Sequence, residues 1–238
     1  MRGLAPFWID PRDRRYAFPD ISLALDEPDG LLAVGGDLRP QRLLAAYRQG
    51  IFPWYNHGQP ILWWSPDPRT VLFPHKLHVS RSLRKTLRQQ RFRVTADTAF
   101  EAVIEACSTP RDNSESGTWI TADMKQAYRH LFELGHAHCV ECWRGDELVG
   151  GLYGVGIGRV FFGESMFSHA RDASKVAFAR LVQQLEQWGY GLVDCQVHSA
   201  HLESLGAENI DREHFRQLLD HWCPQPGRSG RWGVSAEG

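Results

Sequence analysis

Residues 138–162, HCVECWRGDELVGGLYGVGIGRVFF, give the clearest indication of the fold of this chain of 238 residues. Their apolar runs predict three strands in hairpin order, over 138–144, 147–155 and 159–162. The residues that follow predict a helix over 174–188, with Val176, Phe178 and Leu181 on its inner side, and a further strand over 191–197. Strands that alternate with helices in this way predict an α/β (α+β) fold.

Upstream, the same alternation continues, with elements predicted over 71–73, 80–90, 92–95, 98–107 and 121–134. The residues before position 68 lack this alternation. They predict short turns, an aromatic loop and a single helix over 40–49. We therefore expect a small N-terminal domain over 1–67, an α/β domain over 68–223, and a disordered tail rich in Pro, Gly and Ser over 224–238.

The charge balance is close to neutral, with 27 Lys and Arg against 28 Asp and Glu and a net charge of −1. This excludes a histone-like cation but not a local basic patch that binds nucleic acid. There is no apolar run long enough for a transmembrane helix and no signal peptide, so we expect no membrane association. The 5 irregularly spaced Cys favour a reduced, cytoplasmic protein.

One predicted helix carries a basic face. Arg81, Arg84, Lys85 and Arg88 stand at i, i+3, i+4 and i+7, so they share one side of the helix. Phosphate backbones would neutralise such a cluster. The alternative is an ordinary solvated helix face.

Two tryptophans lie in predicted loops. Trp54 follows Pro53, and Trp119 stands beside Gly117, outside any amphipathic repeat. Aromatic side chains on loops can stack on bases, an interaction of about 1–3 kcal/mol per base. The alternative is that both tryptophans cover the core.

Three polar side chains stand in predicted strands. Asp194 and Gln196 are two residues apart, so alternation places them on one face, where a carboxylate and an amide carbonyl suit activation of an amine nucleophile. A structural Asp that holds a turn or pairs with an Arg is an equal alternative. Glu164 is a lone acid at an apolar strand end, and its alternative is a carboxylate held by backbone or by Arg171.

No cofactor or metal is expected. Cys139 and Cys142 form a CxxC pair, but no second ligand pair at fitting spacing accompanies it, and the two would point to opposite faces of a strand. The glycines of residues 150–156 lie between strands and lack the strand–turn–helix context of a dinucleotide site.

Several runs, in one order, resemble the leucyl/phenylalanyl-tRNA–protein transferases over residues 18–219. They are EPDGLLAVGGDL (27–38), GIFPW (50–54), WWSPDPR (63–69), GTWI (117–120), GESMFS (163–168) and DCQV (194–197). The resemblance implies a small N-terminal domain followed by a GNAT-type acyltransferase domain. It implies transfer of Leu or Phe, with Met as a further candidate, from aminoacyl-tRNA to the N-terminal Arg or Lys of a protein, which marks that protein for degradation.

The resemblance also implies residue roles. Asp194 and Gln196 would be the catalytic pair, with Glu164 in the active site beside the reacting ends. Trp54 and Trp119 would sandwich the 3′-terminal adenine. The phosphates of the acceptor stem would be held by Arg81, Lys85 and Arg88. The apolar pocket for the donor side chain would be formed by Leu152, Phe161, Phe178, Leu181 and Val193. This chain departs from the family at Ser199, where Asn is usual.

Two questions stay open at this level. Asp194 would either polarise Gln196 or relay the proton. The activity itself has two alternatives: an acetyl-CoA-dependent GNAT acetyltransferase, which the absence of Gly from residues 169–175 disfavours, and a tRNA-binding protein without catalysis. We expect a monomer.

Overall fold

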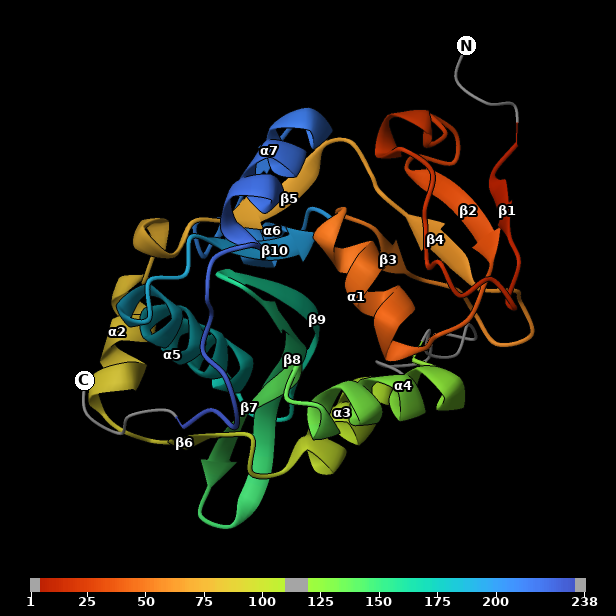
Figure 1. Ribbon diagram of the computed structural model, residues 1–238. Helices are drawn as coiled ribbons and strands as arrows, with labels where there is room; N and C mark the ends of the chain where they lie inside the picture. Colours follow the sequence, from red (N-terminus) through yellow and green to blue (C-terminus); the bar gives the residue numbers. More distant parts are fainter. Residues whose placement is uncertain (1–4, 110–119, 234–238) are drawn as a thin grey trace.

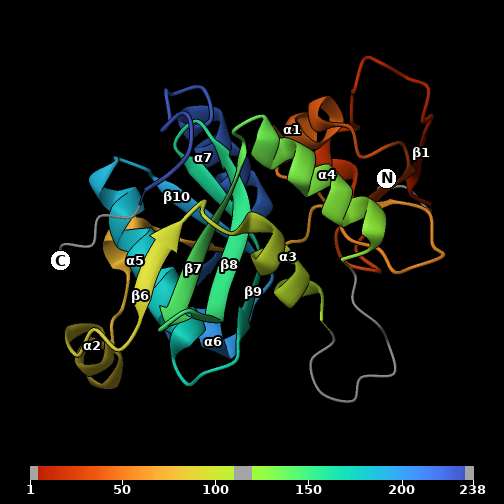
Figure 2. The same ribbon diagram turned by 90° about the horizontal axis from the view of Figure 1, so that it is seen from below.

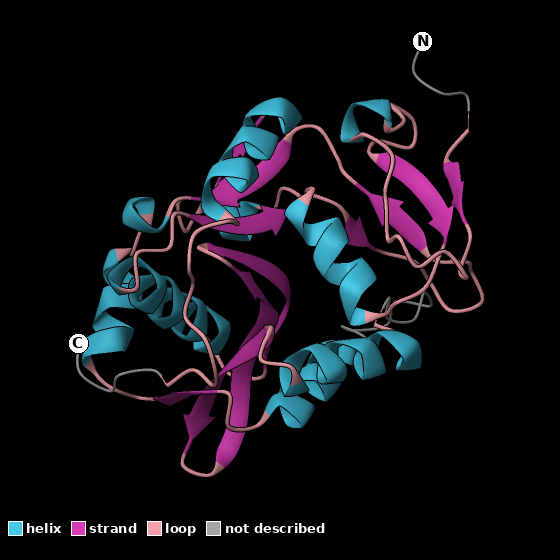
Figure 3. Ribbon diagram, in the orientation of Figure 1, coloured by secondary structure: helices cyan, strands magenta, loops and turns pink. Residues whose placement is uncertain are grey.

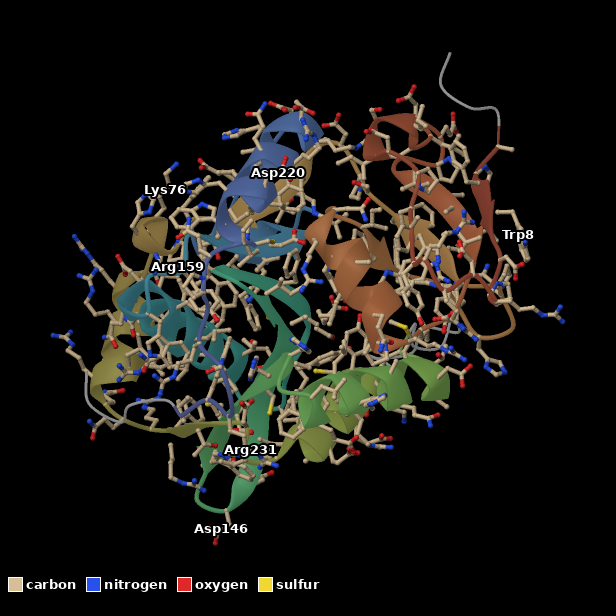
Figure 4. All side chains as sticks on the ribbon, viewed as in Figure 1. Trp8, Lys76, Asp146, Arg159, Asp220 and Arg231 are labelled. Carbon is tan, nitrogen blue, oxygen red and sulfur yellow. The ribbon has the colours of Figure 1, made fainter. Side chains whose placement is uncertain are left out.

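The computed structural model describes residues 5–109 and 120–233, which form a mixed α/β structure around two sheets (Figure 1). The smaller sheet has the order β1-β2-β4-β3. Its strands are β1 (Phe7–Ile9), β2 (Leu31–Gly35), β3 (Phe52–Pro53) and β4 (Leu62–Trp64), and helix α1 (Pro40–Arg48) lies between β2 and β3 in the sequence. At the outer edge, Trp8 of β1 is 71% exposed (Figure 4).

The larger sheet has the order β11-β5-β10-β9-β8-β7-β6. Its strands are β5 (Arg69–Leu72), β6 (Arg93–Ala96), β7 (Ala137–Arg144), β8 (Glu147–Ile157), β9 (Val160–Ser168), β10 (Leu192–Gln196) and β11 (Glu208–Ile210). Within the described chain its strand pairs are antiparallel except β9–β10, which is parallel. A parallel pair needs a crossover, and α5 (Ala173–Gln187) supplies it.

Helices cover both faces of the larger sheet (Figures 2 and 3). One face carries α3 (Phe100–Ser108) and α4 (Ala122–Glu133), and the other carries α5 and α2 (Arg81–Arg88). The remaining helices are α6 (Ala200–Glu203), α7 (Arg212–Trp222) and two short 3-10 turns, Ile21–Leu23 and Pro74–Lys76. Ser80 and Thr121 cap α2 and α4 by accepting the backbone N–H of Leu83 and Met124.

The predicted α/β fold is confirmed, and so are the three strands in hairpin order. Strand β9 is longer than expected, because it continues to Ser168 through a register shift opposite Tyr153 and Gly154. A bulge of this kind lets a strand carry a polar residue past an apolar run without ending the sheet.

The buried core consists of two clusters. The first joins the N-terminal sheet, α1, α3 and α4 to one face of the larger sheet, so Tyr47 and Trp63 pack in the same cluster as Phe162 and Phe215. The second lies beneath α5. A boundary between residues 67 and 68 therefore stays a proposal, since the two sheets share a core there.

The C-terminal segment differs from the disordered tail that its composition predicts. Residues 224–233 run from Arg159, which donates to the Pro226 carbonyl, to Asp97, which accepts the backbone N–H of Trp232, and Trp232 is only 3% exposed. The prediction is wrong for this part because a single large aromatic side chain can anchor a segment that is otherwise Pro- and Gly-rich. Residues 234–238 lie outside the described residues. In the described residues, no helix combines the length and the apolar character that a bilayer span requires.

Candidate active site

The three polar residues singled out in the sequence meet at the end of the β9–β10 pair. Glu164 occupies the register shift of β9, where Ser165 pairs with Tyr153 and Gly163 pairs with Gly154. Because a bulge redirects the side chain of its extra residue, the carboxylate of Glu164 reaches the Nε2 of Gln196 at 3.1 Å. The bulge therefore builds a contact between neighbouring strands that regular alternation does not provide.

Two tyrosines hold the other side of Glu164. Tyr47 of α1 donates its hydroxyl to Oε1 at 2.6 Å, and Tyr128 of α4 donates to Oε2 at 2.7 Å. The two hydroxyl oxygens are also 2.5 Å apart. Both tyrosines are fully buried. Glu164 thus ties the N-terminal helix α1 and the helix α4 to the centre of the larger sheet.

Burial raises the pKa of Glu164 to about 7, although the hydrogen bonds from Tyr47 and Tyr128 oppose the shift. Burial also raises the pKa of both tyrosines well above the usual value, so the phenols keep their protons.

Gln196 has an oriented side chain. Its Nε2 donates to the carbonyl oxygen of Gly163 at 3.0 Å and to Glu164 Oε1 at 3.1 Å. The opposite amide orientation would place oxygen against these two acceptors, so the network fixes the direction of the amide. Both N–H groups are used. Among residues 5–109 and 120–233 no donor bonds the carbonyl oxygen Oε1 of Gln196, which is therefore left as an acceptor for an incoming amine.

The backbone of Gln196 is unusual, with φ at +64° in the left-handed region. A register shift of β10 against β5 lies between Asp194 and Gln196, and it interrupts the alternation from which one shared face was predicted. Left-handed backbone at a non-glycine residue costs about 1–3 kcal/mol and persists where the surroundings impose it. Here Asp194 Oδ1 accepts the backbone N–H of Gln196 at 2.9 Å, so the carboxylate helps to hold this conformation.

Asp194 is fully buried and paired with Arg69. Arg69 Nε donates to Oδ1 at 2.8 Å, and its second terminal nitrogen donates to Oδ2 at 2.7 Å. The guanidinium also donates to the Gly50 carbonyl at 3.1 Å. It lies over the rings of Phe52 and Phe215, at 4.8 and 4.6 Å from their centroids. A bidentate pair of this kind is strong and directional, so the carboxylate of Asp194 is occupied on both oxygens.

The two alternatives for the acidic residues have different outcomes. Asp194 does pair with an Arg, as the alternative of a structural Asp predicted, and it also accepts the backbone N–H of Gln196. Glu164 is held by tyrosines and Gln196 rather than by Arg171, whose side chain is 94% exposed beside Asp172.

The sequence pattern did not single out Arg69, Tyr47 or Tyr128 as site residues. A signal for each existed, because a buried Arg in a strand needs a carboxylate partner and an inward-facing Tyr needs a partner for its hydroxyl. The sequence could not say which partner, since Arg69 and Asp194 are 125 residues apart and Tyr47 and Glu164 are 117 apart.

The structure brings the five apolar pocket candidates together. Leu152, Phe161, Phe178, Leu181 and Val193 are each at most 4% exposed and all belong to the cluster beneath α5. Ser199 caps α6, since its hydroxyl accepts the backbone N–H of Leu202 at 3.2 Å. The hydroxyl of Ser199 is therefore already used in a local structural contact.

The candidate tRNA-binding residues lie on the surface. Trp54 is 46% exposed, and Trp64 fixes its loop by donating Nε1 to the Trp54 carbonyl at 2.7 Å. Trp119 lies outside the described residues. On α2, Arg81, Lys85 and Arg88 are exposed, while Leu83 and Thr86 face the core. Among the described residues, none of the three cations has an acidic partner, which leaves this face free to bind phosphate.

The cysteines of the CxxC pair lie in different surroundings. Cys139 belongs to the first core cluster and Cys142 to the second, and burial raises the pKa of Cys142 to about 12. Within residues 5–109 and 120–233 no group of three or more His, Cys, Asp or Glu side chains is suited to a metal ion.

Comparison with known proteins identifies this chain as a transferase. The family described as "Leucyl/phenylalanyl-tRNA protein transferase" matches residues 71–220, and the N-terminal domain of the same family matches residues 36–67. A relative of that name from Azotobacter vinelandii is 61% identical over 88% of this chain and 92% of its own length. Another from Cellvibrio japonicus is 58% identical over 92% of each chain. The chain belongs to the leucyl/phenylalanyl-tRNA–protein transferase family, and the family and enzyme class predicted from the sequence are confirmed.

Solved structures are much more distant. "The structure of L-PGS from Bacillus licheniformis" is 9% identical, with a TM-score of 0.40, over 71% of this chain and 54% of that chain. A GCN5-related N-acetyltransferase from Kribbella flavida is 14% identical, with a TM-score of 0.34, over 71% and 60%.

Proposed function

We propose that this protein moves Leu or Phe, with Met as a further candidate, from aminoacyl-tRNA to the α-amino group of an N-terminal Arg or Lys, which marks the acceptor for degradation. The observation that carries this proposal is the orientation of Gln196. Its carbonyl oxygen is left as an acceptor by contacts to Gly163 and Glu164, in a chain about 60% identical to enzymes named for this transfer.

The reaction needs a free amine. An unperturbed α-amine has a pKa of about 7.7–8.0, so a substantial fraction is already neutral near pH 7.5. Gln196 Oε1 would accept one N–H of this amine and aim its lone pair at the ester carbonyl carbon. The new C–N bond forms, the bond to the 3′ oxygen of the tRNA breaks, and the amine proton ends on that oxygen. The ester is already activated, so the scheme uses no cofactor.

Asp194 would then act as a positioning residue. Its two oxygens are engaged by Arg69 and by the backbone N–H of Gln196, so it fixes the strained backbone from which the Gln196 side chain extends. This favours orientation of Gln196 over proton relay, the two roles that the sequence left open.

The remaining assignments extend the same proposal. Arg81, Lys85 and Arg88 would hold acceptor-stem phosphates, Trp54 and Trp119 would stack on the terminal adenine, and the cluster beneath α5 would receive the donor side chain. We also propose that the protein is a cytoplasmic monomer. The five free cysteines agree with a reducing compartment.

The test supplies labelled Leu-tRNA and a peptide that begins with Arg. We expect label in the peptide, and none in a matched peptide whose α-amine is acetylated. The absence of label from the free peptide would refute the proposal. Transfer of label to the free peptide from labelled acetyl-CoA, but not from labelled Leu-tRNA, would favour an acetyltransferase.

The basic face of α2 predicts a particular salt dependence. Replacing Arg81, Lys85 and Arg88 together by Gln should weaken tRNA binding and lower the slope of log K against log salt by about 0.7–0.9 for each lost phosphate contact. Titration of the protein with tRNA at several salt concentrations, from low to moderate, measures this slope. The matched control is Arg216→Gln on α7, which removes a cation already paired with Glu213 and Asp220. A triple variant with the wild-type slope would contradict the assignment.

Glu164 predicts the shape of the pH profile. Its carboxylate is the acceptor that orients Gln196, and its pKa of about 7 means that this form is lost as the pH falls through 7. The acceptor amine loses its free form in the same direction. Below pH 6.5 we expect log kcat/KM to rise with a slope of about two in the wild type and about one in Glu164→Gln. Identical slopes would show that Glu164 does not titrate in the reaction.

A further inference from the structure

The C-terminal segment, residues 224–233, is held across the larger sheet by backbone contacts and one buried side chain. Arg159 Nε donates to the Pro226 carbonyl at 3.4 Å, and the backbone N–H of Arg228 donates to the Tyr190 hydroxyl at 3.3 Å. At Gly227, an added Cβ would lie 1.8 Å from the Gly158 carbonyl oxygen, so only glycine allows this approach. Figure 4 labels Arg159, beside the start of the segment, and Arg231, near its end.

Trp232 anchors the far end of this segment. Its backbone N–H donates to Asp97 Oδ2 at 2.7 Å, and the same oxygen lies 2.8 Å from His138 Nδ1. Its ring stacks on the imidazole of His138, with centroids 3.7 Å apart and planes inclined by 6°. An added Cβ at Gly156 would lie 3.2 Å from the Trp232 ring. The position of the indole is thus fixed from several sides.

The Trp232 ring also contacts Phe161, at a centroid distance of 5.7 Å and with planes inclined by 43°. Phe161 is one of the five apolar residues assigned above to the donor pocket. The Phe161 ring also lies close to Gly154, since a Cβ added at Gly154 would lie 2.5 Å from Phe161 Cζ. Phe161 is therefore confined between the glycine-bearing strand β8 and an aromatic ring that the C-terminal segment supplies.

We propose that Trp232 is a specificity-determining residue, because its ring packs against Phe161 and so limits the depth of the pocket that receives the donor side chain. The proposal rests on the proposed function. Residue 232 lies beyond the residues that match the family, 71–220, so the size limit of the pocket would be completed by a segment outside the matched region. Removing the ring should let Phe161 move back and favour the larger donor.

The experiment measures kcat/KM for Phe-tRNA and for Leu-tRNA in competition, with one acceptor peptide that begins with Arg. We expect Trp232→Ala to raise the Phe/Leu ratio by about tenfold or more, since a change of one methylene in an apolar pocket has an effect of about tenfold or more. Trp232→Phe, which keeps an aromatic ring, should shift the ratio less and in the same direction. Gly227→Ala should also raise it by displacing the segment without changing Trp232.

The matched control is Trp143→Ala. Trp143 of β7 donates its Nε1 to Thr95 Oγ1 at 2.8 Å, and within the described residues it has no ring contact with Trp232 or Phe161. This variant removes an indole of the same size from the larger sheet and should leave the ratio within twofold of the wild type. An equal shift in the control would overturn the proposal, because general loosening would then explain it.

Two failures can be told apart. If the wild type transfers both residues but Trp232→Phe and Gly227→Ala leave the ratio unchanged or lower it, the role of Trp232 is refuted and the proposed function stands. If the wild type transfers neither residue, the proposed function fails and the role of Trp232 fails with it.

Discussion

A Gln196→Asn variant should lose about a hundredfold or more in kcat/KM while its Tm stays close to that of the wild type. Losses of this size are usual when a reacting group is misplaced by about 1 Å. Asn tolerates the left-handed backbone at this position, so the variant isolates the side chain. It is shorter by one methylene and cannot contact Gly163 and Glu164 while presenting a carbonyl oxygen to the amine.

Steady-state transfer to a peptide that begins with Arg measures this effect. The control is His198→Ala, two residues further on, which removes an exposed side chain paired with Glu203 and should leave transfer unchanged. Activity of Gln196→Asn within threefold of the wild type would contradict the role given to the amide.

An Arg69→Met variant should be destabilised by about 3–5 kcal/mol, because it leaves the buried carboxylate of Asp194 without its partner. Denaturant unfolding measures the free energy. Adding Asp194→Asn should recover at least half of the loss, since a neutral amide has a far smaller desolvation penalty. Failure of the second substitution to restore any stability would mean that Arg69 acts by packing alone, through Phe52 and Phe215.

The same double variant separates the two roles of Asp194. The amide oxygen that Asp194→Asn introduces can still accept the backbone N–H of Gln196, so an orienting role predicts transfer within about tenfold of the wild type. A proton relay needs a carboxylate and predicts a loss of at least about a hundredfold. The comparison is made at equal folded concentration, with Tm recorded for each variant.

How far the sequence could predict the fold is clear from residues 138–162. Their apolar runs predicted three strands, and each strand is present within two residues at its start. The continuation of β9 to Ser168 was missed, because Gly163 and Glu164 interrupt the apolar pattern and a bulge leaves no distinctive sequence signal. The position of Trp232 was missed because composition favours disorder there, and a single aromatic anchor changes the outcome.

The candidate site was predictable in its residue types but not in its connections. Asp194, Gln196 and Glu164 stood out because polar groups in apolar strands need partners. The links from Glu164 to Tyr47 and Tyr128, and from Asp194 to Arg69, depend on tertiary packing between segments more than thirty residues apart. Periodicity describes one element at a time and cannot give such pairings.

We infer that the Gln196 amide, held by Glu164 and by the Asp194–Arg69 pair, directs the α-amine of an acceptor to an aminoacyl ester. Mass spectrometry of the acceptor peptide after incubation with Leu-tRNA tests it. With the wild type we expect a gain of one leucyl residue, located by fragmentation at the α-amine of the N-terminal Arg, and with Gln196→Asn almost none in the same time. No added residue, addition at a lysine side chain, or equal addition by the variant would contradict the claim.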